Sequence, residues 1–141
     1  MKMFYATLAL TIGGNVLYHL AQKSIPAGVH PLVSIVASYM TAMVLTLGGL
    51  FLFPLRDPIA VEIGRLNWAS LALGLSIVAV ELGFLLAYRM GWRISLASVT
   101  SNTAVALILL PTSVFVFRER LSPTNALGFL LCVVGLVLVT R

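Results

Sequence analysis

A single carboxylate, Glu81, lies in the middle of the apolar stretch SIVAVELGFLLAY, which runs from Ser76 to Tyr88. A charged side chain at the centre of a membrane-spanning helix costs roughly 2.5 to 3.5 kcal/mol on insertion scales, so such a residue usually binds something or is paired. No other acidic residue, and no Lys or Arg at a similar depth, lies within an apolar stretch. Because burial disfavours a charged carboxylate, we expect Glu81 to exchange a proton for a cationic substrate. The alternative is a protonated Glu81 that only fixes helix packing.

Other polar side chains recur at the three- and four-residue steps that place them on one face of a helix. The first apolar stretch carries such a row: Thr7, Thr11, Asn15, Tyr18 and Gln22, with His19 four residues after Asn15. We predict that the residues lining a substrate cavity around Glu81 are Asn15, Tyr18, His19, Phe84, Tyr88, Ser98 and Asn102. Structural alternatives remain open, because Ser and Thr often bond their own helix and Asn can join two helices.

The composition identifies an integral membrane protein. Of 141 residues, 60% are hydrophobic and 9% are charged, whereas a soluble domain carries about 25% charged residues. The net charge of +5 comes from scattered basic residues without a basic stripe, so we expect no nucleic-acid partner. The sequence shows no nucleophile–base pair and no metal-ligand spacing. We therefore expect no enzyme activity, no metal and no cofactor, and the one cysteine excludes a disulfide framework.

Five apolar stretches approach the length of about 20 residues that a membrane span needs: 4–22, 32–53, 68–88, 94–117 and 122–140. Ser122 followed by Pro123 is typical of a helix start, with the serine as N-cap. The longest link, from Pro54 to Asn67, has room for a short interfacial turn. Because only helices or closed barrels satisfy their backbone in lipid, we predict one all-α transmembrane domain over residues 1–141.

An odd number of spans places the two termini on opposite sides of the membrane. The side of the N-terminus receives Lys2, Arg56, Arg65, Arg118 and Arg120. The other side receives Lys23, Arg89, Arg93 and Arg141. Basic residues in short loops set the orientation of a membrane protein. Because they are distributed almost equally here, they hardly favour one orientation over the other. Two alternatives remain: one orientation is imposed by the N-terminus or the longer loop, or copies insert both ways and pair antiparallel.

The last third of the chain, from Leu96 to Val139, resembles the end of a repeat in EamA-type drug/metabolite transporters. A small and polar helix start is followed by a proline midway, a loop glutamate and a glycine-rich last helix. The matching positions are Pro111, Glu119, Leu121, Gly128 and Gly135. The resemblance implies a five-helix repeat that is half of a ten-helix inverted-repeat transporter, so that two copies complete it as an antiparallel homodimer.

The small multidrug resistance proteins belong to the same superfamily, and the stretch from Gly128 to Val139 is similar to their dimerisation helix. The similarity implies a dimer interface at Gly128, Cys132 and Gly135. Those proteins exchange protons for cations at a glutamate in the first helix. Here that helix has Asn15, and the glutamate lies in the third span.

Together, these features predict a secondary active transporter of small cationic or amphipathic metabolites or drugs in the cell (inner) membrane. The expected mechanism is proton-coupled export by alternating access. The expected partners of the chain are a second copy of itself, the lipid bilayer and a small-molecule substrate. Two alternatives stay open. The chain is a subunit of a heteromeric transporter or lipid-carrier flippase, or it is a membrane scaffold without transport.

Overall fold

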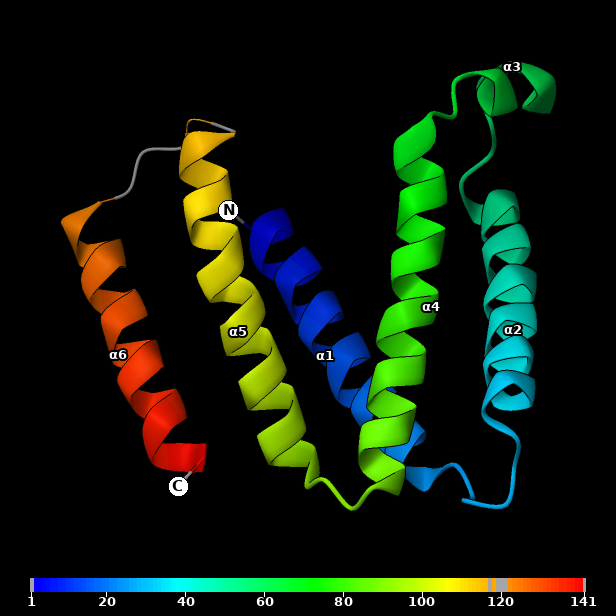
Figure 1. The fold of residues 1–141 in the computed structure, drawn as a ribbon. Coiled ribbons are helices and arrows are strands. Elements are labelled where there is room, and N and C mark those ends of the chain that lie inside the picture. Colours follow the sequence, from blue (N-terminus) through cyan, green and yellow to red (C-terminus); the bar gives the residue numbers. More distant parts are fainter. Residues whose placement is uncertain (1, 117, 119–121, 141) are drawn as a thin grey trace. The chain divides into compact units, whose positions relative to one another are not determined.

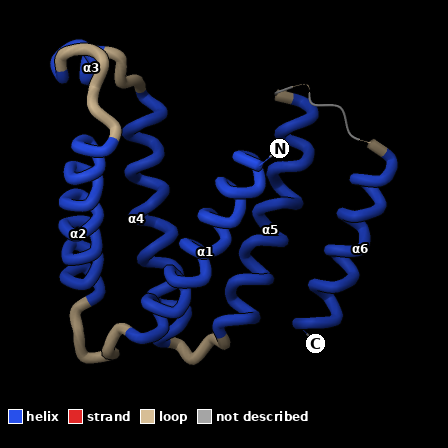
Figure 2. The backbone as a smooth tube through the Cα atoms, turned by 180° about the vertical axis from the view of Figure 1, so that it is seen from behind, coloured by secondary structure: helices blue, strands red, loops and turns tan. Residues whose placement is uncertain are grey.

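The computed structural model describes residues 2–116, 118 and 122–140, and all the regular secondary structure in these ranges is helical (Figures 1 and 2). The prediction of an all-α chain is therefore confirmed for the described residues. In chain order the helices are α1 (Lys2–Ser24), α2 (Pro31–Leu52), α3 (Ile59–Gly64), α4 (Trp68–Arg89), α5 (Ile94–Phe115) and α6 (Pro123–Thr140).

Three of these helices, α2, α4 and α5, are long and apolar enough to cross a membrane, with 22 residues each. Within α6 the apolar helix is shorter, over Pro123–Leu138. Large apolar side chains such as Leu45, Leu71 and Ile108 are exposed on the three long helices. An apolar surface this extensive is unfavourable in water and suits contact with lipid. Length and surface thus agree with the character of a membrane protein.

A helix lies at each of the five predicted spans. The remaining described helix, α3, lies between Pro54 and Asn67, where a short turn is expected. Local chemistry accounts for several helix ends. The predicted cap at Ser122 is present, because its hydroxyl accepts a hydrogen bond from the Thr124 backbone at 3.3 Å. Several positions used in the sequence analysis lie outside the described residues: Phe117, Glu119, Arg120, Leu121 and Arg141.

The ends of α4 are also fixed by individual residues. Asn67 is the N-cap, and its side-chain oxygen accepts from the Ala69 backbone N–H at 3.0 Å. Gly91 follows the other end with φ +93°, a left-handed conformation that glycine adopts without steric cost. Helix α4 is therefore confined to Trp68–Arg89 at both ends.

The contacts divide the chain into two compact units, and the single domain predicted over 1–141 stays a prediction. Unit 1 comprises Met1–His19 and Gly91–Arg141, and unit 2 comprises Leu20–Met90. Unit 1 contains the longer part of α1 together with α5 and α6, of which α5 and α6 are in contact. Helix α5 continues past Pro111 to Phe115.

Unit 2 is built on α2 and α4, which pack against each other and run in opposite directions (Figures 1 and 2). Helix α3 lies at one end of the pair, and the last residues of α1 lie at the other end. The buried side chains of this unit are Gln22, Ile35, Leu85 and Tyr88. They come from the end of α1, the start of α2 and the end of α4, so the tightest packing lies away from α3.

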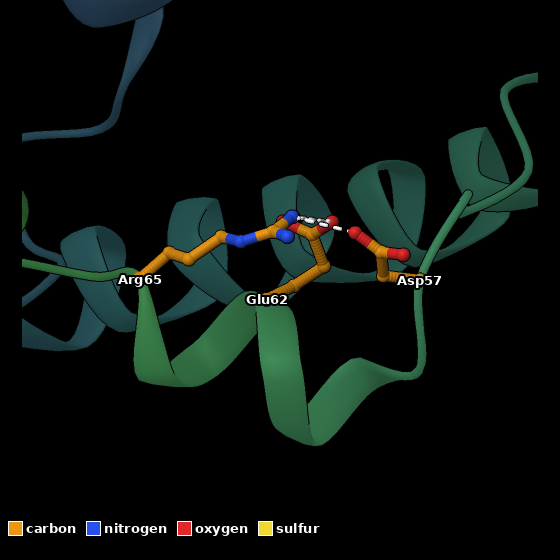
Figure 3. A network of polar contacts seen from close by, with 3 residues as sticks. All are labelled: Asp57, Glu62 and Arg65. Atoms are coloured by element: carbon orange, nitrogen blue, oxygen red, sulfur yellow. Dashed lines mark hydrogen bonds and ion pairs between the residues drawn. The ribbon is translucent and has the colours of Figure 1, made fainter.

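The α3 segment carries a small network of charges, shown in Figure 3. Nη1 of Arg65 contacts Oδ2 of Asp57 at 2.7 Å and Oε1 of Glu62 at 2.9 Å. The three side chains are considerably exposed, and such ion pairs contribute at most about 1 kcal/mol each. The network neutralises one arginine at this end of unit 2.

Candidate functional site

A cavity of about 360 Å³ lies between α2 and α4 within unit 2. Its lining comes from one face of each helix, at steps of three or four residues along the chain. The lining residues are Ser38, Tyr39, Ala42, Met43 and Thr46 on α2, and Gly74, Ile77 and Glu81 on α4. Gly74 has no side chain, and no atom outside its own stretch of helix lies within 4 Å of an added Cβ. The cavity is therefore open at this position, on the helix face that carries Glu81. The cavity is therefore mostly apolar, with one ionisable carboxyl group.

Two of the three hydroxyl groups in this cavity are already satisfied by their own helix. The Ser38 hydroxyl donates to the Ser34 carbonyl at 3.2 Å. The Thr46 hydroxyl donates to the Ala42 carbonyl at 2.8 Å. Because a hydroxyl has one hydrogen to donate, these two side chains keep little capacity to bind a further ligand as donors.

Tyr39 and Glu81 differ from the other polar residues of the cavity. The Tyr39 hydroxyl and Oε2 of Glu81 are both enclosed, and neither has a hydrogen-bond partner among the described residues. A buried polar group without a partner costs about 1 to 3 kcal/mol, and more if it is charged. A phenol and a carboxyl group that share a cavity and lack partners are suited to bind a proton, a water molecule or a cationic group.

The last residues of α1 hold the helix that carries Glu81. Nε2 of Gln22 donates to the Glu81 backbone carbonyl at 3.4 Å. Nζ of Lys23 donates to the Tyr88 carbonyl at 3.3 Å and lies 5.6 Å from the centre of the Tyr88 ring. These contacts position α4 at the carboxylate and again two turns later.

Phe84 and Tyr88, predicted to line the cavity with Glu81, share its helix and stack on each other with ring centres 6.0 Å apart. The Tyr88 ring is buried and also contacts Lys23. Neither aromatic residue belongs to the lining of the α2–α4 cavity. Their part in substrate binding stays a prediction, whereas their packing role is visible.

The other predicted lining residues belong to unit 1, so their position beside Glu81 stays a prediction. Asn15 is exposed, and His19 is buried with its ring 5.3 Å from that of Tyr18. The hydroxyls of Thr7 and Thr11 donate to carbonyls of α1, and that of Ser98 donates to the Ser95 carbonyl. These three hydroxyls follow the structural alternative, in which Ser and Thr bond their own helix.

A second cavity, of about 470 Å³, lies between α5 and α6 within unit 1. Its lining includes predicted residues of two kinds: Asn102 from the substrate set, and Gly128 and Cys132 from the dimer interface. The remaining lining residues are Thr103, Ala106, Thr124, Asn125 and Phe129. Gly135 does not line this cavity, and it has no atom within 4 Å of an added Cβ. Gly128 and Cys132 thus lie at a groove of their own unit, which leaves the predicted interface untested.

Sequence reasoning misses Tyr39 and the rest of the α2 face, because the stretch 32–53 contains no charged residue. A signal was present. Ser38, Ala42 and Thr46 recur at four-residue steps and form a row of small residues, with Tyr39 beside it. Such rows permit close approach of a neighbouring helix, but the neighbour cannot be read from α2 alone.

Comparisons with protein-family models, with curated proteins and with solved structures give no match to this chain. The resemblance to EamA-type drug/metabolite transporters stays a prediction from the sequence.

Proposed function

We propose that this chain is a multi-pass secondary active transporter of the inner membrane that exchanges protons for small cationic or amphipathic metabolites at Glu81. The observation that carries the proposal is the cavity between α2 and α4, in which Oε2 of Glu81 and the Tyr39 hydroxyl are enclosed and have no hydrogen-bond partner among the described residues. A carboxylate in an apolar cavity attracts a cation and repels an anion. The same group binds a proton, so proton and substrate compete for one site.

The residues that line the cavity favour a substrate with an apolar body and one positive charge. Met43 and Ile77 supply apolar contact surface, and a thioether adapts its conformation to different ligands. Tyr39 can donate a hydrogen bond to the carboxylate or offer its ring face to a cation. In the proposed cycle, a proton binds Glu81 on one side of the membrane and displaces the cation there. On the other side Glu81 releases the proton and binds the next cation.

The proposed assembly is an antiparallel homodimer of the EamA type. In this proposal α1 and α6 cross the membrane along with α2, α4 and α5, so that each copy contributes five spans. Two inverted copies then form a ten-helix transporter with sites near the midplane, as inverted repeats do in other transporters. The nearly even distribution of basic residues between the two sides supports insertion in both orientations.

The topology of the C-terminus tests this assembly. Two reporters are fused in turn after Arg141, one active only in the cytoplasm and the other active only outside. Both fusions are expected to give strong signals. Each signal should reach at least about a third of the signal from a fixed-topology control, since the basic residues give little bias. Activity of only one form excludes the self-paired inverted dimer and favours a partner subunit.

Substitution of Tyr39 by phenylalanine tests the composition of the cavity. We expect the affinity for tetraphenylphosphonium, an amphipathic organic cation, to fall by about 3- to 10-fold, the net effect of losing one ordinary hydrogen bond. The measurement is equilibrium binding to purified protein at several pH values. Thr46→Val is the matched control, because its hydroxyl already donates to Ala42. Equal effects of the two substitutions would contradict a special role for Tyr39.

A further inference from the structure

The two ends of unit 2 carry different charges. At the α3 end, Arg65 is paired with both Asp57 and Glu62 (Figure 3). At the other end, where α1 ends, α2 begins and α4 ends (Figure 1), lie Lys23 and Arg89. The sequence contains no Asp or Glu from Met1 to Arg56, and none from Leu82 to Arg118. The helix ends here therefore contribute positive charge, and neither they nor the adjoining loops carry a carboxylate.

Both cations lie at the last turn of α4: Lys23 contacts it, and Arg89 belongs to it. Lys23 donates from Nζ to the Tyr88 carbonyl and lies over the Tyr88 ring. Arg89, the next residue, donates from Nη2 to the Val29 carbonyl in the loop before α2. We call Lys23, Val29, Tyr88 and Arg89 the cationic end of unit 2.

The guanidinium of Arg89 retains hydrogen-bonding capacity. Its described partner, the Val29 carbonyl, is neutral, and its Nε, which is enclosed, has no hydrogen-bond partner among the described residues. Neither of the described ion pairs involves Arg89. An arginine presents five N–H donors in a planar arrangement that matches an oxyanion such as phosphate. The half-buried Arg89 is therefore suited to one more contact, with an anion.

We infer that the cationic end of unit 2 binds the phosphate of an anionic lipid headgroup. Arg89 and Lys23 end helices, and α4 has the length of a membrane span, so the two cations lie where headgroups lie. Basic side chains at this level attract anionic lipids. A lipid is favoured over free phosphate because the membrane holds its headgroups at high local concentration beside the helix ends.

The test measures binding of short-chain phosphatidylglycerol to purified, delipidated protein in neutral detergent, by calorimetry or by native mass spectrometry. Phosphatidylcholine and inorganic phosphate serve as comparison ligands. We expect phosphatidylglycerol to bind at least about 10-fold more tightly than phosphatidylcholine, and Lys23→Ala and Arg89→Gln each to weaken it about fivefold. Salt should weaken the binding, because exposed charges are screened.

Arg65→Gln is the matched control, since it removes a cation that is already paired at the opposite end of unit 2. It should leave the affinity unchanged, and far-ultraviolet circular dichroism checks that each variant is folded. Lys23→Ala keeps the test decisive if Arg89→Gln does not fold. Equal binding of phosphatidylcholine, equal binding of inorganic phosphate, or equal weakening by Arg65→Gln would each overturn the assignment.

Discussion

Replacement of Glu81 by glutamine is expected to lower proton-driven uptake of tetraphenylphosphonium into vesicles by about 100-fold, equivalent to about 3 kcal/mol. Glutamine keeps the size of the side chain, but its neutral amide does not bind and release a proton near neutral pH. It also does not attract a cation as a carboxylate does. The measurement uses vesicles that contain the purified protein and have an acidic interior. Uptake is recorded before and after the pH gradient is dissipated.

Glu62→Gln is the matched control for this experiment. Glu62 is also a glutamate, but it lies on α3 and is paired with Arg65. Its substitution should change uptake by less than about twofold, as expected for an exposed ion pair. If Glu81→Gln transports as well as the unmodified protein, Glu81 is not the coupling group, and the scaffold alternative gains support.

Truncation of Leu85 to alanine is expected to destabilise the protein by about 2 to 4 kcal/mol. Leu85 is 1% exposed, the most enclosed large side chain among the described residues, and it lies one turn after Glu81 on α4. Its loss leaves a cavity that the surrounding helices fill only in part. The free energy of unfolding is measured by denaturant titration in detergent micelles.

Leu86→Ala provides the comparison for Leu85, because it makes the same chemical change at the next residue. Leu86 is 43% exposed, so lipid or detergent can fill the space that its side chain leaves. Its cost should stay below about 1 kcal/mol. Equal costs at the two positions would show that α4 does not pack as described at this end of unit 2.

The positions of the helices could be predicted from the sequence because their signals are local. Apolar stretches of span length and Ser122 followed by Pro123 each mark a helix or its start, and the structure has helices at these places. The short helix α3 was expected as a turn from the composition of its segment. In each case the physical cause lies within a few residues of its effect.

Part of the candidate site could also be predicted. Glu81 was identified because an acidic residue within an apolar stretch is costly wherever the helix packs. Its partner Tyr39 was not identified, because 42 positions separate 39 from 81 and only the pairing of α2 with α4 brings them to one cavity. The contacts of Gln22 and Lys23 with α4 were missed for the same reason.

The polar row on α1 shows what a sequence pattern alone does not tell. Thr7 and Thr11 share a helix face with Asn15, but their hydroxyls donate to backbone carbonyls of the same helix. Periodicity locates a face and does not tell whether its polar groups are already satisfied. Only the hydrogen bonds make that distinction.

The central claim is that a proton and a cation compete for Glu81, and proton release tests it most directly. Tetraphenylphosphonium is added to purified protein in weakly buffered detergent solution, and the change in pH is recorded with a dye. The account predicts proton release that saturates with binding of the cation and is absent in Glu81→Gln but present in Glu62→Gln. Binding of the cation without proton release, or release that persists in Glu81→Gln, would contradict it.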